Sequence, residues 1–179
     1  MPRRSTLSAS ELDTIAMLAA LCLFLSAVEY LIPKPVPFMR LGLANLPILV
    51  ALELLSPSRV ALLIALKVVG QGLVNGTLFS YVFLFSAAGS AASGLVMLAA
   101  SRIPRERLSL VGICILGALG SNIAQIVMAR FVIFGAGAWL MAPPFIAVGT
   151  VTAVILGLFA RKFVGSSSWF RQKKESIGA

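Results

Sequence analysis

Apolar residues fill six long runs of the chain, and short segments rich in proline, glycine or charge separate these runs. A helix of about twenty apolar residues is long enough to cross the hydrocarbon core of a bilayer. We therefore predict an all-α, polytopic membrane bundle of about six transmembrane helices. The second run is short for a crossing and is the weakest of the six. The runs cover residues 14–32, 41–55, 60–75, 78–100, 108–134 and 145–163.

The segments between the runs contain residues that end helices. Prolines alternate over 33–37, where they remove backbone donors and favour extended geometry, so we expect a loop there. Ser56 and Pro57 offer an N-cap and a first-turn proline to the third helix. The last loop, 135–144, contains two glycines and two prolines and is weakly helical in pattern. These breaks divide the chain into an N-terminal segment (1–13), a transmembrane domain (14–163) and a basic tail (164–179).

Positive charges gather on one side of this arrangement. With a cytoplasmic N-terminus, only Lys34 and Arg40 fall in outer loops. Because Lys and Arg concentrate in cytoplasmic loops, we expect both termini in the cytoplasm and the chain in the cytoplasmic (inner) membrane. The first run is too long for a cleaved signal sequence, so we expect it to remain as a span. The cytoplasmic cations are Arg3, Arg4, Arg59, Arg102, Arg105, Arg107, Arg161, Lys162, Arg171, Lys173 and Lys174.

Composition agrees with a membrane location. Of the 179 residues, 59% are hydrophobic and 12% are charged, whereas about a quarter of a soluble domain is charged. The net charge of +9 would by itself suggest nucleic acid as a partner. The cations lie at the ends of apolar runs and not on one face of a soluble fold, so we expect no nucleic-acid binding.

The residue types that perform most catalysis are scarce in the sequence. It has no histidine, and Asp13 is its single aspartate, so it lacks the aspartate clusters with which prenyl synthases bind magnesium. Cys22 and Cys114 lie inside apolar runs, as small buried residues do. The phosphate-binding loop of ATPases does not occur. We therefore expect no catalytic residue, no metal and no cofactor, and at most an accessory role beside an enzyme.

Polar residues inside the predicted helices form the candidate site, because ionisable groups in a bilayer are costly and by default mark function. Lys67 lies in the middle of the third helix, and Gln71 and Asn75 follow at intervals of four on the same helical face. Glu53, near the cytoplasmic end of the second helix, is expected to pair with Arg59 or to reach the interface. The candidate substrate-binding residues are Glu29, Arg40, Asn45, Lys67, Gln71, Asn75, Asn122, Gln125 and Arg130.

Two interpretations of these polar residues stay open. In the first, they form a buried network that locks the bundle, with Glu29 neutralising Lys67 or Arg130. In the second, they line an outward-facing polar cavity for a small molecule. An anionic molecule suits this cavity, because Lys67, Arg130 and Arg40 outnumber Glu29.

Small residues spaced four apart occur on three of the predicted helices, and such stripes let helix backbones approach closely. One interpretation is packing within this bundle. The other is that the stripe on the first helix, Ala16 and Ala20, docks a partner subunit. The other two stripes are Ser86, Ser90 and Gly94 on the fourth helix, and Gly149, Ala153 and Gly157 on the sixth.

Two stretches of the sequence are unusual in combination. They are PVPFMRLGLANLP at 35–47 and KVVGQGLVNGTLFS at 67–80, with Phe83, Ser86, Gly89 and Ser93 spaced beyond them. Together with residues 117–125 they resemble the Gx transporter family, which is also labelled heptaprenyl diphosphate synthase component I. The resemblance covers residues 15–163 and adds Thr77 and Ser80 to the candidate substrate-binding residues.

That family is similar to the substrate-binding S components of energy-coupling factor transporters. The resemblance implies a six-helix bundle with an outward pocket that takes up a small molecule, with a flavin- or isoprenoid-related compound as the suggested substrate. It also implies a membrane T subunit that meets Ala16 and Ala20, and two ATPase subunits that supply energy. The second label implies an alternative, a non-catalytic membrane subunit of a heptaprenyl or polyprenyl diphosphate synthase. A structural subunit of a redox complex is a third possibility, and we favour the transporter.

Overall fold

The computed structural model of the protein describes residues 9–33 and 39–178, and every regular element in these ranges is helical. The prediction of an all-α fold is confirmed. The elements are α1 (Ala9–Leu31), the 3-10 turn η1 (Leu43–Asn45), α2 (Leu46–Leu54), α3 (Pro57–Val74), α4 (Tyr81–Ala100), α5 (Leu110–Ala129), the π-helical turn η2 (Arg130–Phe134), the 3-10 helix η3 (Gly135–Met141), α6 (Ala142–Ser166) and α7 (Ser168–Gly178).

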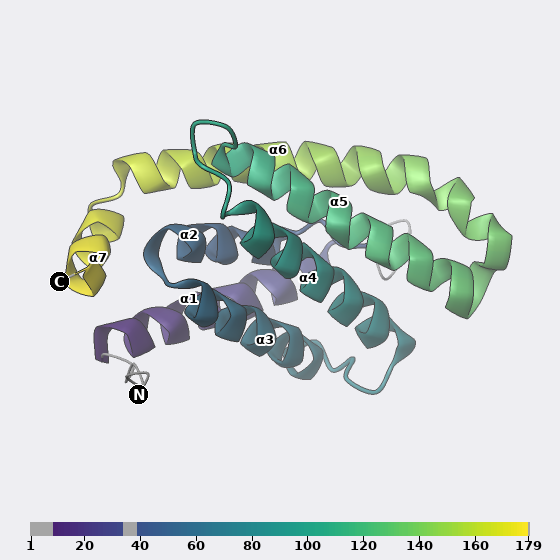
Figure 1. Ribbon diagram of the computed structural model, residues 1–179. Helices are drawn as coiled ribbons and strands as arrows, with labels where there is room; N and C mark the ends of the chain where they lie inside the picture. Colours follow the sequence, from purple (N-terminus) through teal and green to yellow (C-terminus); the bar gives the residue numbers. More distant parts are fainter. Residues whose placement is uncertain (1–8, 34–38, 179) are drawn as a thin grey trace, which may run out of the picture.

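Four helical stretches are long and apolar enough to cross a membrane: 9–31, 57–74, 81–100 and 110–166. The last stretch contains both α5 and α6, which η2 and η3 join and which pack against each other (Figure 1). Figure 1 also shows that the start of α1, the α2–α3 turn, the α4–α5 turn and α7 lie at one end of the molecule. The α3–α4 and α5–α6 connections lie at the other end. The chain is therefore a multi-pass helical membrane protein.

The helices place apolar side chains outside and polar side chains inside. Phe24, Leu95 and Ile155 lie on three different helices and are 63%, 62% and 60% exposed. Glu29 and Lys67, in contrast, are only 1% and 2% exposed. A bilayer stabilises this arrangement, because lipid tails surround apolar side chains as well as a protein core does, whereas ionised groups in lipid are costly.

The buried polar residues form a layer between two apolar cores. Along α4, Phe85 belongs to the smaller core, Ser86 to Ser93 supply polar groups, and Met97 belongs to the larger core. Along α5 the same order runs in reverse, from Cys114 in the larger core to Ile126 in the smaller one. The larger core lies toward the α7 end of the bundle, so the polar layer is closed off on both sides by apolar packing.

The second apolar run forms a much shorter helix than predicted. α2 has nine residues, and at about 1.5 Å per residue it spans about 14 Å, half of the about 30 Å hydrocarbon core. The predicted crossing over 41–55 is therefore wrong in length. The physical reason lies in the preceding segment, whose backbone is hydrogen-bonded to Glu29 of α1, so that the chain enters α2 from within the bundle.

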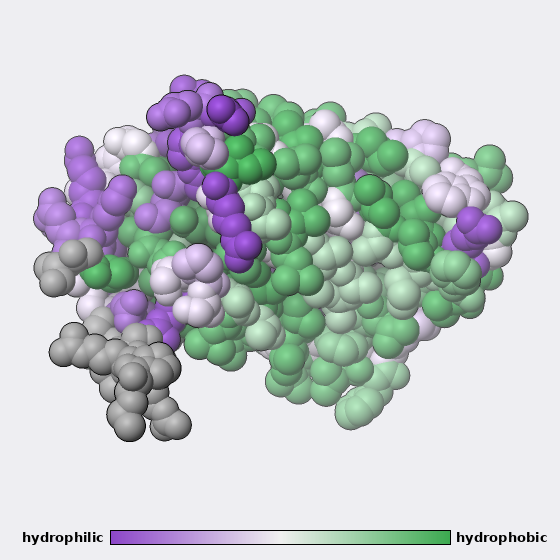
Figure 2. Space-filling model, viewed as in Figure 1, coloured by the Kyte–Doolittle hydropathy of each residue, from purple (hydrophilic) through white to green (hydrophobic). Residues whose placement is uncertain are grey.

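The hydrophilic side chains on the visible face gather at the α7 end, as Figure 2 shows, and apolar side chains cover most of the rest. Two ion pairs tie helices together at this end. Glu53 at the end of α2 pairs with Arg105 in the α4–α5 turn, and Arg59 of α3 pairs with Glu11 of α1 at 3.6 Å. Glu53, expected to pair with Arg59 or to reach the interface, forms an ion pair with Arg105.

Several predicted boundaries shift. α1 begins at Ala9 and not at residue 14, and α5 ends at Ala129, so that Arg130 falls in η2. α6 begins at Ala142, with Pro143 and Pro144 in its first turn, where a missing N–H costs no helical hydrogen bond. Most of the basic tail (164–179) forms α7. The predictions for Arg3, Arg4, Lys34 and the motif residues 35–38 lie outside the described residues.

Candidate functional site

The carboxylate of Glu29 organises the centre of the bundle. It accepts hydrogen bonds from three consecutive backbone N–H groups, those of Leu41 (2.9 Å), Gly42 (3.1 Å) and Leu43 (2.8 Å). Gly42 has φ 87°, a left-handed conformation that a side chain would disfavour. Such a turn points successive N–H groups toward one side and forms an anion-binding concavity. Glu29 thereby fixes the segment that leads into α2 against the last turns of α1.

Arg40 connects this segment to α3 and α4. Its Nε lies 3.4 Å from the Glu29 carboxylate. Its guanidinium donates to Gln71 Oε1 at 2.6 Å and also donates to the hydroxyl of Ser86. Gln71 Oε1 accepts a second hydrogen bond, from Ser90 at 3.2 Å. The predicted residues Glu29, Arg40 and Gln71 are therefore joined in one network that links four segments of the chain.

Lys67 extends the network along α3. Its ammonium donates to Asn45 Oδ1, and the Asn45 amide in turn donates to Ser93 of α4 at 3.0 Å. Asn45 lies in η1 and is 7% exposed. In the described part of the chain, no carboxylate forms an ion pair with Lys67. Within the described residues, Glu29 forms its ion pair with Arg40 and not with Lys67 or Arg130.

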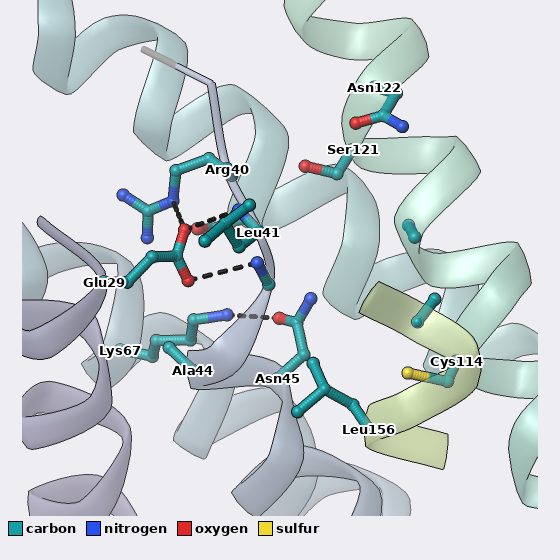
Figure 3. A pocket seen from close by; sticks show the side chains of 14 residues that line it. Glu29, Arg40, Leu41, Ala44, Asn45, Lys67, Cys114, Ser121, Asn122 and Leu156 are labelled. Atoms are coloured by element: carbon teal, nitrogen blue, oxygen red, sulfur yellow. Dashed lines mark hydrogen bonds and ion pairs between the residues drawn. The ribbon is translucent and has the colours of Figure 1, made fainter. Parts of the chain in front are cut away.

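The network surrounds a small cavity, drawn in Figure 3. Lys67 and Asn45 point toward it from one side, and Ser121 and Asn122 face them from α5. Its volume is about 20 Å³, which is room for one water molecule. The lining residues include Glu29, Arg40, Gly42, Asn45, Lys67, Ser90, Cys114, Ser121 and Asn122.

The α5 wall of the cavity depends on two glycines of neighbouring helices. A Cβ at Gly149 of α6 would lie 2.3 Å from the Asn122 amide, which donates to the carbonyl of Phe145 at 2.8 Å. A Cβ at Gly89 of α4 would lie 2.4 Å from the Gln125 amide, which donates to Ser121 at 2.9 Å. These glycines therefore let the α5 amides lie directly against helix backbones.

The remaining predicted site residues lie away from the cavity. Asn75 caps the end of α3 and donates to Ser26 at 3.3 Å. Thr77 lies in the α3–α4 turn, where its carbonyl accepts from the hydroxyl of Ser80, the N-cap of α4. Arg130 is exposed, and its guanidinium lies 5.7 Å from the ring centre of Trp139 in a cation–π contact. Ala16 and Ala20 are both exposed on α1.

Sequence reasoning missed the α4 side of the site. Ser86, Ser90 and Ser93 were assigned to backbone packing or to a motif, yet all three hydrogen-bond to network residues. Their spacing of four and three residues carried the signal, because it places three hydroxyls on one helical face. A hydroxyl stripe opposite the Lys67–Gln71 stripe would have indicated that α3 and α4 face each other across the polar layer.

A second cavity lies on the outside of the bundle, between α1, α2 and α6. Its volume is about 290 Å³ and its lining is wholly apolar. It lies toward the α7 end of α6, because Phe163 both lines it and contacts the ring of Trp169 on α7 at 6.2 Å. We call it the apolar groove, and its residues are Leu21, Leu25, Leu46, Pro47, Val50, Phe159 and Phe163.

Among the described residues, no group of three His, Cys, Asp or Glu side chains is placed to hold a metal ion. The sequence model of the heptaprenyl diphosphate synthase component I family matches residues 18–163. This match covers most of the chain, including the whole polar layer, and the chain belongs to that family. No curated protein and no solved structure matches the chain.

Proposed function

We propose that this member of the heptaprenyl diphosphate synthase component I family is a substrate-binding membrane subunit, similar to the S components of energy-coupling factor transporters. The observation that carries the proposal is the polar layer itself. Three charged side chains, Glu29, Arg40 and Lys67, line a cavity deep in a bundle whose outer surface is apolar. Ionisable groups at this depth are costly, and they are retained in membrane proteins mainly where they bind or conduct something.

The location of the layer supports uptake from the outer side. Lys67 lies about midway along α3, and the hydrophilic end of the molecule lies at the α7 end of the bundle. With that end in the cytoplasm, both termini are cytoplasmic and the polar layer is separated from the outside by the smaller apolar core. In this topology α1 and the short α2 together form one hairpin, and six helices build the domain.

The cavity at the proposed site is small and closed. A cavity of about 20 Å³ holds no substrate larger than a water-sized group. Entry therefore requires the smaller core to open, and the segment that carries Met39 and Arg40 is the part of that core without helical support. A small molecule that replaces the hydrogen bonds of Arg40 and Lys67 stabilises the open form by differential binding.

Partner subunits complete the proposal. Ala16 and Ala20 are exposed on α1, whereas the stripes on α4 and α6 are buried inside the bundle. The α1 stripe is therefore the small-residue surface left for a membrane T subunit, and ATPase subunits drive the cycle. A flavin- or isoprenoid-related compound is the proposed substrate.

Native mass spectrometry of the protein gently purified from its own membrane tests this function. We expect a bound small molecule that is lost in Lys67→Met and retained in Lys162→Met, which removes an exposed cation at the α7 end. Retention of the molecule in a folded Lys67→Met variant would contradict the proposal. Absence of any copurified molecule, together with no uptake by cells that express the chain with its partners, would also contradict it.

The apolar groove favours a second candidate function, a non-catalytic membrane subunit of a polyprenyl diphosphate synthase. Its about 290 Å³ suit part of a hydrocarbon chain, and it lies near the hydrophilic end. The same experiment separates the two candidates. A stable complex with a soluble, aspartate-rich synthase, and no bound small molecule, would replace the transporter function with this one.

A further inference from the structure

The charges around the polar cavity do not balance. Arg40 and Lys67 are cationic, and Glu29 is the single carboxylate in the lining. That carboxylate is already used, because it accepts three backbone hydrogen bonds and pairs with Arg40. One positive charge therefore remains on Lys67, which is 2% exposed. An uncompensated cation in a buried site costs several kcal/mol unless an anion joins it.

The hydrogen-bond donors around the cavity are also in excess. The Lys67 ammonium has three N–H groups, and within the described residues it donates to one acceptor, Asn45 Oδ1. The Ser121 hydroxyl accepts from Gln125 and keeps its own O–H to donate. The Asn122 amide nitrogen donates to Phe145 and lies against Gly149 of α6, so we do not count it among these donors. Figure 3 shows the Lys67 ammonium on the α3 side of the cavity and the Ser121 hydroxyl on its α5 side.

The size of the cavity selects the ligand class. A volume of about 20 Å³ admits one water-sized group. Excess positive charge and unused donors favour a negatively charged occupant over a neutral one. We propose that this cavity binds one small anionic group, such as chloride or the carboxylate end of a larger molecule, held by Lys67 and Ser121. This inference deepens the proposed function. It rests on that function only in assuming that the anionic group belongs to a substrate.

Thermal unfolding of the purified chain in lipid nanodiscs tests the anion site directly. The protein is exchanged into sodium gluconate, whose anion is too large for the cavity, and is then titrated with chloride or formate at constant ionic strength. At ten times the dissociation constant, we expect the melting temperature to rise by about 3–6 °C. The rise should be saturable, should disappear in Lys67→Met, and should persist in Lys162→Met. No rise, or an equal rise in Lys67→Met, would overturn the inference.

A second variant keeps the test decisive if Lys67→Met does not fold. Ser121→Ala removes one proposed donor without changing a buried charge. We expect the chloride concentration at half-saturation to increase about tenfold or more, since a hydrogen bond to a charged group contributes about 1.5–3 kcal/mol. An unchanged half-saturation concentration would contradict the assigned donor set.

Butyrate distinguishes the two sources of the anion. A site for a free ion responds to chloride and formate and does not respond to butyrate, whose alkyl chain does not fit. A site for the carboxylate of a substrate responds to all three, because the bundle opens around the chain.

Failure of the proposed function is a separate outcome. Anion binding without a copurified molecule or uptake would keep the anion site and contradict the transporter function. A copurified neutral molecule, with no effect of anions on the melting temperature, would keep the transporter function and contradict the anion site.

Discussion

At the scale of single residues, Glu29 determines how the centre of the bundle is built. The backbone N–H groups of residues 41–43 precede or begin η1, so they have no helical carbonyl to donate to. The Glu29 carboxylate accepts their hydrogen bonds instead. It also compensates the charge of Arg40 at 3.4 Å. Buried carboxylates with several charge-assisted hydrogen bonds act as structural anchors, because no other side chain accepts four donors at once.

Glu29→Gln should therefore destabilise the protein strongly. The amide keeps one acceptor oxygen and loses the charge, so the partly buried Arg40 loses its counter-charge. Breaking a buried pair from one side costs about 3–5 kcal/mol. We expect a loss of this size in the free energy of unfolding, measured by reversible denaturation in detergent micelles. Glu106→Gln, at an exposed position, is the control and should change it by less than about 0.5 kcal/mol. Equal effects of the two variants would show that Glu29 is no anchor.

Residue-level prediction from the sequence succeeded where helical spacing governs the outcome. Lys67 and Gln71 are four apart, so a helix places them on one face, and both are buried in the same layer. The partners of Glu29 were not predictable, because backbone N–H groups have no sequence signature. They converge on the carboxylate because Gly42 is left-handed, and a glycine at that position is compatible with many other turns.

At the scale of helices, the small-residue stripes separate into two kinds. Gly149, Ala153 and Gly157 are buried where α6 meets α5, and the α4 stripe is buried as well. The prediction that such a stripe serves packing within the bundle is confirmed for α6, where Gly149 and Gly157 lie directly against α5. On α4, Ser86 and Ser90 form hydrogen bonds with the polar network. Spacing alone did not distinguish them from the exposed α1 stripe, because which face of a helix turns inward depends on its neighbours.

Gly157→Ala should weaken the contact between α5 and α6. A Cβ at this position would lie 2.7 Å from the Cα of Val111, a backbone atom that cannot rotate away. Overpacking of this kind costs about 1–3 kcal/mol, and we expect a loss of that size in the free energy of unfolding. Gly165→Ala in the same helix meets nothing within 4 Å and should be neutral or stabilise by up to about 1 kcal/mol. Similar values for both variants would argue against close α5–α6 packing.

At the scale of the whole molecule, the α1–α2 hairpin decides the topology. If α1 crosses the membrane and the short α2 returns, the α3–α4 connection lies opposite to the start of α1. If α2 did not bring the chain back across the membrane, every later connection would change sides. The cationic end of the molecule would then no longer face one compartment. In Figure 1 the start of α1 and the α2–α3 turn lie at the same end, which supports the first arrangement.

Cysteine labelling of intact cells tests this topology. The native Cys22 and Cys114 are 0% and 4% exposed and are replaced by alanine to give a clean background. Phe79→Cys, at a fully exposed position in the α3–α4 connection, should react with an impermeant maleimide in intact cells. Glu106→Cys and Gln172→Cys, both exposed at the α7 end, should react only after permeabilisation. Labelling of Glu106→Cys from outside would invert the topology. The polar layer would then be separated from the cytoplasm by the smaller core, and uptake from the outer side would be impossible by the proposed path.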